Sequence, residues 1–329
     1  MSIKIQNLSK SFKTYEREPG LKGALKSFIK RNYTDFHALQ NINLNVENGE
    51  ILGILGENGA GKTTLIKLMV GLLHPTTGDV SVNDYIPWNR KNDFLKMITV
   101  VMGQKNQLWW DIPASESFLL NKRIYQIEDK IYNKILNEMV ELLDIRHKLN
   151  TQVRRLSLGE RMKMEIIASL LHRPKIIMLD EPTLGLDVIS QSKIREFVQY
   201  YNDQYKATFI ITSHYMQDID SMCKRVFVMN KGKGLYDGNF STLIKKINPT
   251  KKLTYTFSEK PNNELLLQIS KSFNVNIEQN ILIAHLDDSK LNDLLKLLFE
   301  LSSSTSISIE DLPVEETMRS FFESPESYL

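Results

Sequence analysis

The chain has 329 residues, 42% hydrophobic and 25% charged, a composition typical of a globular protein large enough for more than one domain. Its 42 basic and 39 acidic residues leave a net charge of +3, which is too balanced to indicate a partner nucleic acid. The single cysteine excludes internal disulfides and cysteine-based zinc sites, and no apolar run is long enough to span a membrane, so any membrane role should be peripheral, through a partner.

The N-terminal segment predicts two strands separated by a basic insertion. Residues 2–8 alternate weakly and favour a strand, which is followed by basic residues around Phe12. Over 15–35, apolar residues at helical spacing among lysines and arginines predict a short amphipathic helix. This helix would either lie on a membrane or partner, or pack on its own domain. Alternating apolar residues at 42–46 predict the next strand.

The sequence GENGAGKTT at 56–64 has the spacing of a phosphate-binding loop. An apolar run at 50–55 predicts a buried strand before it, and apolar spacing from Leu65 to Leu72 predicts a helix after it. Lys62 would reach the outer phosphates, and the Thr63 hydroxyl would hold magnesium. The alternative is a glycine-rich turn with a chance lysine. The flanking elements favour a nucleoside triphosphate site, formed by Gly56, Glu57, Asn58, Gly59, Ala60, Gly61, Lys62, Thr63 and Thr64.

Strands and helices alternate from residue 76 onward. Apolar runs predict strands at 76–84, 98–102, 175–182, 207–214 and 225–230, and helical spacing dominates 105–171 and returns around 194–201. This alternation predicts an α/β domain with a largely parallel sheet.

Asp180 and Glu181 end the predicted strand 175–182, at the edge where open α/β sheets place their ligands. Because neighbouring strand residues point to opposite sides, one carboxylate can face a magnesium ion and the other an attacking water. We assign Asp180 to magnesium, through water, and Glu181 to orienting and deprotonating the nucleophile. The alternative is a charged strand end in solvent.

Residues 157–160, Ser-Leu-Gly-Glu, form the S-x-x-E pattern of a capping box ahead of an apolar helix. Taken alone, the pattern indicates only a well-formed helix start. An anion-binding role would need a second subunit, because a helix end that caps itself cannot also hold a phosphate in the distant site of its own subunit.

After residue 247 the pattern changes to β-α-β-β-α-β over 253–309, the order of ferredoxin-like folds, followed by a helix near 315–322. We expect a small α+β accessory domain at 246–329, separate from the domain at 1–245.

Residues 1 to about 245 resemble the ATPase subunit of ABC transporters, whose motifs occur here in the family's order. Residues 56–63 match Walker A, Gln104 the Q-loop glutamine, 156–160 the signature motif, and 176–181 Walker B with its catalytic glutamate. Residues 184–187 match the D-loop, His214 the switch histidine, and Phe12 the aromatic residue that stacks on adenine. The resemblance implies a P-loop NTPase domain with a helical subdomain at about 105–172.

The resemblance also implies a head-to-tail dimer of identical or different ATPase chains, with ATP and Mg²⁺ between Walker A of one subunit and the signature motif of the other. Ser157 and Gly159 would reach the γ-phosphate, which His214 would also contact. Gln104 would join Thr63 and Asp180 around magnesium and link it to movement of the helical subdomain. The implied catalytic side chains are Lys62, Glu181 and His214.

Two motifs depart from the family's usual pattern. In the signature motif, usually LSGGQ, Leu158 replaces a glycine and Glu160 replaces the glutamine. We expect activity because Ser157 and Gly159 are kept, although the added charge is unfavourable near a triphosphate unless Glu160 turns away. The D-loop reads LGLD where SALD is common.

The single ATPase module, the insertion and the small C-terminal domain resemble type 2 exporter ATPases for drugs, lipids or polysaccharides. Such a chain would power a separate membrane permease from the cytoplasmic face of the cell membrane. Trp109 and Trp110 would either contact that permease or pack inside the helical subdomain. Import is the alternative direction. A soluble ABC ATPase acting on ribosomes or DNA is less favoured, since a second module and a basic stripe are missing, and a GTPase is disfavoured because 230–233 reads NKGK rather than N-K-x-D.

Overall fold

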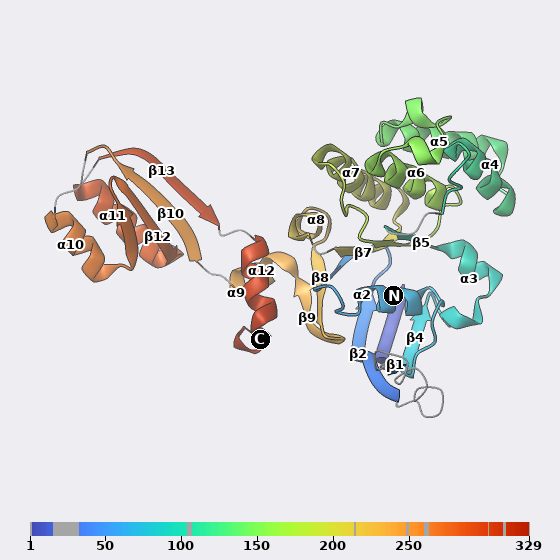
Figure 1. Cartoon of the computed structure of the whole chain (residues 1–329), viewed down its shortest axis with the longest axis horizontal. Coiled ribbons are helices and arrows are strands. Elements are labelled where there is room, and N and C mark those ends of the chain that lie inside the picture. Colours follow the sequence, from blue (N-terminus) through green and yellow to red (C-terminus); the bar gives the residue numbers. More distant parts are fainter. Residues whose placement is uncertain are drawn as a thin grey trace, which may run out of the picture. The chain divides into compact units, whose positions relative to one another are not determined.

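The structure is a computed structural model that describes residues 2–15, 33–103, 107–213, 215–247, 250–259, 263–301, 303–311 and 314–328. The chain divides into two compact units, Met1–Phe240 and Ser241–Leu329 (Figure 1). The motifs predicted for a nucleotide site all fall in the first unit.

A six-stranded sheet with the order β5-β6-β7-β3-β8-β9 forms the centre of the first unit. The first five strands run parallel, and β9 pairs antiparallel with β8. Strand β7 is buried along its whole length and β6 over all but its last residue, as expected for parallel strands covered on both faces. The predicted α/β architecture is therefore confirmed. The strands are β3 (Ile51–Leu55), β5 (Ile98–Met102), β6 (Ile176–Asp180), β7 (Thr208–Ser213), β8 (Arg225–Asn230) and β9 (Lys233–Asn239).

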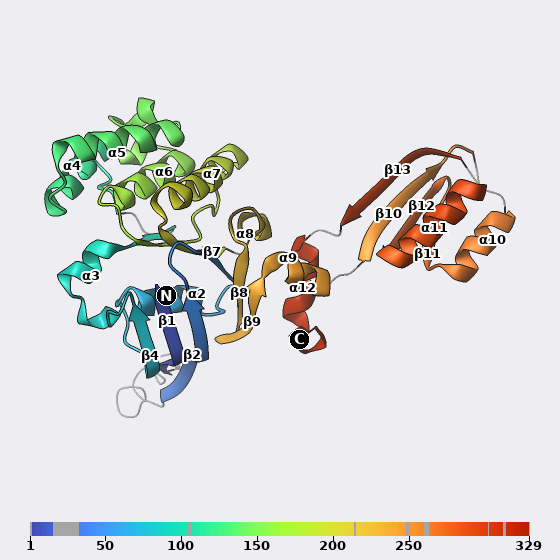
Figure 2. The same cartoon turned by 180° about the vertical axis from the view of Figure 1, so that it is seen from behind.

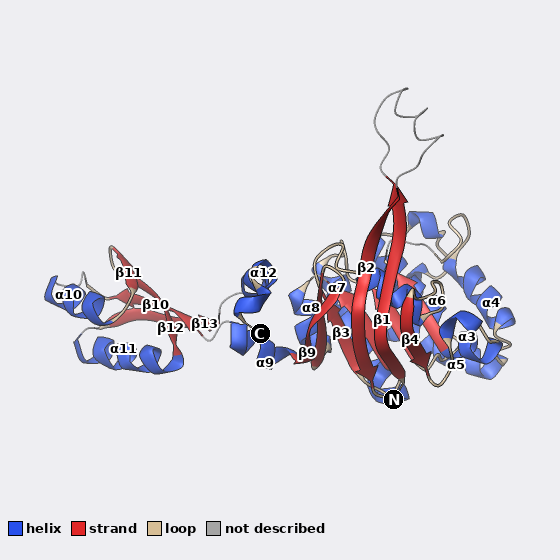
Figure 3. Cartoon of the chain, turned by 90° about the horizontal axis from the view of Figure 1, so that it is seen from below, coloured by secondary structure: helices blue, strands red, loops and turns tan. Residues whose placement is uncertain are grey.

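A three-stranded antiparallel sheet, with the order β2-β1-β4, forms a second layer from β1 (Ile3–Tyr15), β2 (Tyr33–Val46) and β4 (Thr77–Val82). β1 and β2 continue as a long ribbon (Figure 3). The prediction of a strand over 2–8 was too short, because cross-strand pairing holds the basic segment around Phe12 in β1. Of the helix predicted over 15–35, residues 16–32 lie outside the described residues. The described ends, 15 and 33–35, are strand.

Helix α2 (Lys62–Met69) is packed in the core that the two sheets share. Its Leu65 and Leu68 are fully buried in one cluster with Ile3 of β1 and Ile54 of β3. The helix ends before the predicted Leu72, because residue 71 is a glycine at φ 71°, in the left-handed region. This packing holds the first turn of α2 directly after β3.

The remaining helices of the first unit alternate along the chain with the strands of the two sheets. Helices α4 to α7 lie on the side of the six-stranded sheet opposite the three-stranded sheet (Figures 1 and 2). No described helix has the length and apolar character needed to cross a membrane. The helices are η1 (Pro87–Asn89), α3 (Asn92–Met97), α4 (Ala114–Ile124), α5 (Asp129–Leu142), η2 (Arg146–Lys148), η3 (Val153–Arg155), α6 (Leu158–Leu170), α7 (Val188–Tyr205) and α8 (Met216–Met222).

The second unit contains a four-stranded antiparallel sheet with the order β11-β12-β10-β13. Alternate residues of β10, such as Leu253 and Tyr255, are buried in one cluster with Leu294 and Leu298 of α11. The β-α-β-β-α-β element order is the one that the sequence predicts, and an accessory role for this unit stays a prediction. Its elements are α9 (Phe240–Ile247), β10 (Thr250–Phe257), α10 (Asn263–Ser272), β11 (Val275–Glu278), β12 (Ile281–Asp287), α11 (Asp288–Leu301), β13 (Ser304–Asp311), α12 (Val314–Glu323) and η4 (Pro325–Ser327).

Candidate active site

The loop between β3 and α2 has the backbone shape of an anion cradle. Gly61, the N-cap of α2, has φ 105°, and a Cβ atom there would lie 2.7 Å from the carbonyl oxygen of Ala38. Gly59 has φ 83°, and a Cβ atom there would meet nothing within 4 Å, so the loop is open on that side. No side chain caps α2, which leaves the N–H groups of its first turn for a ligand. The loop therefore fits the phosphates of a nucleotide.

Lys62 opens α2 and places its ammonium group inside the loop. Its Nζ donates to the carbonyl oxygens of Gly56 at 2.7 Å and Glu57 at 3.2 Å, and it lies 3.7 Å from Oε1 of Glu181. Burial lowers the pKa of Lys62, and the carboxylates of Glu181 and Asp180 partly offset that effect. The loop thus contains a buried cation next to its open N–H groups.

Thr63 and Thr212 hold the Asp180 carboxylate between them. Thr63 Oγ1 donates to Asp180 Oδ2 at 2.9 Å, and Thr212 Oγ1 donates to Asp180 Oδ1 at 2.6 Å. A hydroxyl beside a carboxylate is a hard oxygen donor set, which fits a magnesium ion that keeps several waters. Two predicted magnesium residues are therefore in contact.

Glu181 leaves β6 with its backbone in the left-handed region, at φ 54°. Its N–H donates to the carbonyl oxygen of Thr212 at 3.1 Å and to the Thr212 hydroxyl at 3.0 Å. The strand alternation that we used to separate Asp180 from Glu181 does not apply, since the bend turns both toward the start of α2. The two carboxylates line one cavity of about 290 Å³, together with Asn58, Thr63, Lys67, Met102 and Gly103.

Gln104 and His214 lie outside the described residues, but the residues beside them are placed. The N–H of Gly103 donates to the carbonyl oxygen of Asp180 at 2.9 Å. Ser213 ends β7, next to β6 in the sheet, and its hydroxyl accepts from the N–H of Tyr215 at 2.9 Å. Gly103 and Ser213 therefore lie at the end of the sheet that carries Asp180 and Glu181. The predicted contacts of Gln104 and His214 stay predictions.

Phe12 lies half-buried on the ribbon of β1 and β2. It pairs with Phe36 across the strands, and Nζ of Lys10 lies 5.0 Å from its ring centroid. The ribbon reaches the phosphate loop at Ala38, whose carbonyl oxygen lies 2.7 Å from the position that a Cβ atom would take at Gly61. Stacking of Phe12 on adenine stays a prediction.

Ser157 caps α6 with both hydrogen bonds of a capping box. Ser157 Oγ accepts from the N–H of Glu160 at 3.2 Å, and the Glu160 carboxylate accepts from the N–H of Ser157 at 2.9 Å. Glu160 also pairs with Lys148 at 3.1 Å. Burial raises the pKa of Glu160, but these partners outweigh it and the net shift is downward. The Glu160 charge is therefore neutralised within its own chain.

Gly159 is buried against the D-loop of its own chain. A Cβ atom at this position would lie 2.3 Å from Oγ of Ser190 and 3.2 Å from Oδ2 of Asp187. Asp187 in turn caps α7 by accepting from the N–H of Ser190 at 2.9 Å. Glycine is thus required for packing within the chain, and contact of Ser157 or Gly159 with the nucleotide of a second subunit stays a prediction.

Thr212 is a site residue that the sequence reasoning missed. It is fully buried, and its hydroxyl connects Asp180 with the backbone of Glu181. A threonine inside an apolar strand has no local pattern that distinguishes it. The order β6-β7 in the sheet could have found it, because parallel pairing places Thr212 opposite Asp180.

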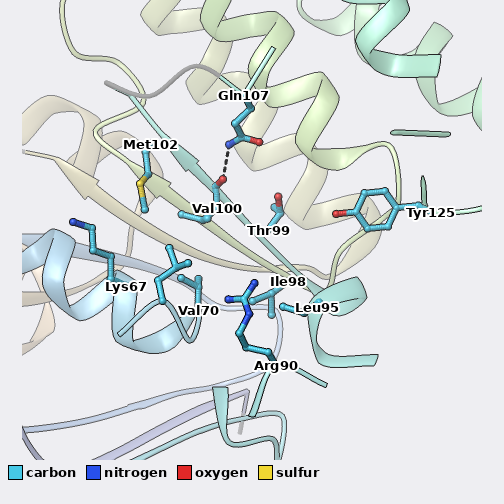
Figure 4. Close-up of a pocket in the computed structure, with 11 residues that line it drawn as sticks. Lys67, Val70, Arg90, Leu95, Ile98, Thr99, Val100, Met102, Gln107 and Tyr125 are labelled. Carbon is cyan, nitrogen blue, oxygen red and sulfur yellow. Dashed lines mark hydrogen bonds between the residues drawn. The ribbon is translucent and has the colours of Figure 1, made fainter. Parts of the chain in front are cut away.

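A groove of about 710 Å³ lies beside the nucleotide cavity. Val100 and Ile98 of β5 contribute apolar side chains, Lys67 and Arg90 approach from the α2 side, and Gln107 and Tyr125 from the helical side (Figure 4). Gln107 is held by a bond from its Nε2 to the carbonyl oxygen of Val100 at 2.6 Å. Both Lys67 and Met102 also line the nucleotide cavity, so the two hollows share walls.

Trp109 and Trp110 follow Gln107 and are 61% and 45% exposed. The guanidinium of Arg161 on α6 lies 5.4 Å from the ring centroid of Trp110. Neither tryptophan is buried inside the helical part of the unit, so both expose aromatic surface, and a contact with a partner stays a prediction.

Residues 39–184 match the ABC transporter family. The chain is 31% identical to the ABC transporter ATP-binding protein NatA of Bacillus subtilis, over 68% of this chain and 90% of that protein. It is 30% identical to the bacitracin transport ATP-binding protein BcrA of Bacillus licheniformis, over 66% of this chain and 70% of that protein. An ATP-binding cassette solved as a dimer with ADP and Pi, in a post-hydrolysis state, has a TM-score of 0.59 at 22% identity and covers 72% of this chain and 98% of its own.

These sites and matches identify a nucleotide-binding cassette. The chain belongs to the family of ABC transporter ATP-binding proteins. It is an ATP-binding subunit of the class that works with membrane subunits and forms dimers in related structures.

Proposed function

We propose that this chain hydrolyses ATP to power export of a drug, lipid or polysaccharide through a separate membrane permease, from the cytoplasmic face of the membrane. The observation that carries the proposal is that Thr63, Asp180 and Glu181 line one cavity, with Nζ of Lys62 at 3.7 Å from Oε1 of Glu181. A buried cation, a hard-oxygen pair and a second carboxylate supply phosphate binding, metal binding and base catalysis.

Each side chain has a distinct part in this proposal. Lys62 binds the outer phosphates once it leaves the loop carbonyls. Thr63 and Asp180, with Gln104, would hold Mg²⁺, which when bound offsets charge on the phosphate oxygens. Glu181 orients the attacking water and takes its proton, and His214 contacts the same phosphate.

A second ATPase chain, identical or different, completes the site. Ser157 is exposed, and a hydroxyl that accepts the bond from Glu160 still has its own hydrogen to donate. In the proposed dimer that hydrogen goes to the γ-phosphate held by the opposite chain. The dimeric cassette of similar fold supports this arrangement.

The permease would dock at the groove and at the two tryptophans. An apolar floor with Lys67 and Arg90 at its side suits an amphipathic segment that carries an acidic residue. Because Lys67 and Met102 line both the groove and the nucleotide cavity, a movement at the phosphates would reach the groove through these two side chains.

Export is favoured over import by the resemblance to type 2 exporters, and one relative is named for bacitracin transport. Import remains the second candidate. Inside-out vesicles that contain the whole complex separate the two, because an exporter accumulates its cargo in the lumen when ATP is added outside.

The substitution Glu181→Gln tests the hydrolytic role. Without the base, ATP turnover should fall by about 10²- to 10⁴-fold, while ATP affinity is kept and the ATP-bound dimer becomes stable enough to isolate. Glu196→Gln is the matched control, since Glu196 is exposed on α7 and bonds to its helix neighbours Ser192 and Lys193. Full turnover in the Glu181→Gln variant would refute the assignment.

Replacing Trp109 and Trp110 with Ala tests the docking surface. ATP binding should be unchanged, and less of the membrane protein that co-purifies with the wild-type chain should be recovered. Phe299→Ala, at a 60% exposed aromatic in the second unit, controls for loss of exposed aromatic surface in general. Normal recovery and normal transport in the double variant would exclude this surface.

A further inference from the structure

Asp218, on α8, is a buried carboxylate with a full set of partners. It is 1% exposed. Its Oδ2 accepts hydrogen bonds from the hydroxyls of Thr183 and of Ser213, the latter at 3.1 Å. Its Oδ1 accepts from Nε of Arg195 at 2.8 Å, and Nη2 of Arg195 lies at the same distance. One side chain thus binds residues from three separate segments.

The partners of Asp218 lie next to the residues proposed to act on ATP. Thr183 is fully buried and follows Glu181 by two positions. Ser213 directly precedes position 214, and its hydroxyl also accepts from the N–H of Tyr215, which directly follows that position. The carboxylate of Asp218 therefore holds the backbone on the far side of Glu181 and on both sides of position 214.

The third partner extends the network to the D-loop. Nη2 of Arg195 donates to Oε1 of Gln191 at 3.1 Å, and Nε2 of Gln191 donates to the carbonyl oxygens of Leu186 at 3.1 Å and of Thr183 at 3.5 Å. Leu186 lies in the stretch 184–187, which matches the family's D-loop. A continuous set of hydrogen bonds therefore joins Asp218 to the chain after Glu181, to the end of β7 and to the D-loop.

The backbone at Glu181 needs such support. A glutamate at φ 54° is in a sparsely populated conformation, which persists only where its surroundings hold it. Thr212 holds the N–H of Glu181 from one side. Thr183, bound to Asp218, holds the chain on the other side.

We infer that Asp218 is a positioning residue for ATP hydrolysis, which sets the backbone of Glu181 through Thr183 and the chain around position 214 through Ser213. A buried ion pair is weak evidence of stability, because apolar residues of the same volume often serve as well. The pair of Asp218 and Arg195 matters here because its hydrogen bonds are directional and fix the positions of the groups that they join. The inference rests on the proposed ATPase function and deepens it, since it assigns what sets the geometry of the proposed base.

The test compares two isosteric changes on the full chain, assayed with the membrane protein that co-purifies with it. Asp218→Asn removes the charge, and Thr183→Val removes the donor hydroxyl with little change in shape. Misplacement of a reacting group by about 1 Å can cost 10²-fold, so kcat should fall by roughly 10- to 100-fold in both variants. The KM and the equilibrium affinity for ATP should stay at the wild-type values, because the phosphate loop is not part of the network.

Two further variants separate positioning from general damage. Thr183→Ser keeps the donor hydroxyl and should restore kcat to the wild-type value. Asp237→Asn removes a carboxylate that accepts from Nε of Arg225 at 2.7 Å, at the start of β8, and should leave kcat unchanged. This pattern, with cooperative unfolding retained, supports the inference.

Other outcomes overturn it. Wild-type kcat in Thr183→Val and Asp218→Asn would show that the network does not position the base. A parallel loss of kcat and ATP affinity in both, matched by Asp237→Asn, would show a structural role only. A wild-type complex that turned over no ATP would instead refute the proposed function itself, and the inference with it.

Discussion

The starts of α2 and α6 are two helix N-termini that the sequence marks with glycine-containing motifs, and they differ in what satisfies their N–H groups. At α2 the N-cap is Gly61, with no side-chain hydrogen bond and no acidic residue in the first turn. At α6 the N-cap is Ser157, which forms a complete capping box with Glu160. One helix start is left open, and the other is closed by its own side chains.

This difference indicates which helix start holds phosphate within a single chain. Both ends carry the positive partial charge of the helix dipole. Only at α2 do open N–H groups lie beside a buried cation, Lys62, and a carboxylate–hydroxyl pair. At α6 the capping box occupies the N–H groups of Ser157 and Glu160, and the Ser157 hydroxyl keeps its own hydrogen, which is consistent with a contact made to another subunit's ligand.

The largest expected effect within this comparison comes from Lys62→Ala. A hydrogen bond to a charged group contributes about 1.5–3 kcal/mol, which corresponds to a roughly 10- to 150-fold higher Kd for ATP. Equilibrium binding of ATP by the full chain measures it.

The matched control for Lys62→Ala is Lys67→Ala, because Lys67 lies five residues later on α2 and lines the cavity of Asp180 and Glu181, whereas the loop carbonyls accept from Lys62. A smaller loss of affinity is expected there. Equal affinity in wild type and Lys62→Ala would mean that α2 is not the phosphate-binding helix, and the comparison with α6 would lose its basis.

Elements of the fold could be predicted from the sequence where the pattern that specifies them lies within a short stretch of the chain. Strand β5, for example, was predicted to the residue, since its mainly apolar run stops at Gly103. The ribbon of β1 and β2 was not predicted in full, because pairing between distant residues, and not an apolar pattern, holds Phe12 in a strand. The bend at Glu181 was also missed, since strand alternation stops where the backbone enters the left-handed region.

The residues of the candidate site also divide into those that a local pattern marks and those that only distant contacts reveal. Lys62 and Thr63 stand in a contiguous motif, and Asp180 and Glu181 end a recognisable strand, so spacing alone found them. Thr183, Thr212 and Asp218 are single polar residues whose importance depends on the order of strands in the sheet. The bonds of Thr212 to Asp180 and Glu181, and the bond between Thr183 and Asp218, join positions that are 31 to 35 residues apart.

A moderate effect is expected from Ser157→Ala, which opens the cap of α6. Loss of a serine N-cap costs about 0.5–2 kcal/mol of unfolding free energy, because the N–H of Glu160 loses its acceptor. Denaturant unfolding of the full chain, followed at the transition of the first unit, measures the change. Ser192→Ala is the control, since its hydroxyl donates to the exposed Glu196 on the same helix. Equal midpoints for the two variants would show that the α6 cap contributes nothing.

The smallest effect is expected from Glu160→Gln. Glutamine can keep the capping bond to the N–H of Ser157, so only the partly exposed pair with Lys148 is lost, and exposed pairs contribute about 0.2–1 kcal/mol. This loss should shrink further in high salt.

The pH dependence of the free energy of unfolding shows whether the ionised Glu160 side chain stabilises the folded state. Because the folded state lowers the pKa of Glu160, its contribution is fully present above the unfolded-state pKa and is lost as the pH falls through the folded one. Unfolding measured against pH should therefore show less acid sensitivity in Glu160→Gln than in wild type. The KM for ATP should not change, since the charge is turned toward Ser157 and Lys148. A lower KM in Glu160→Gln would mean that the wild-type charge faces the triphosphate, and that α6 is not closed toward the nucleotide in the working dimer.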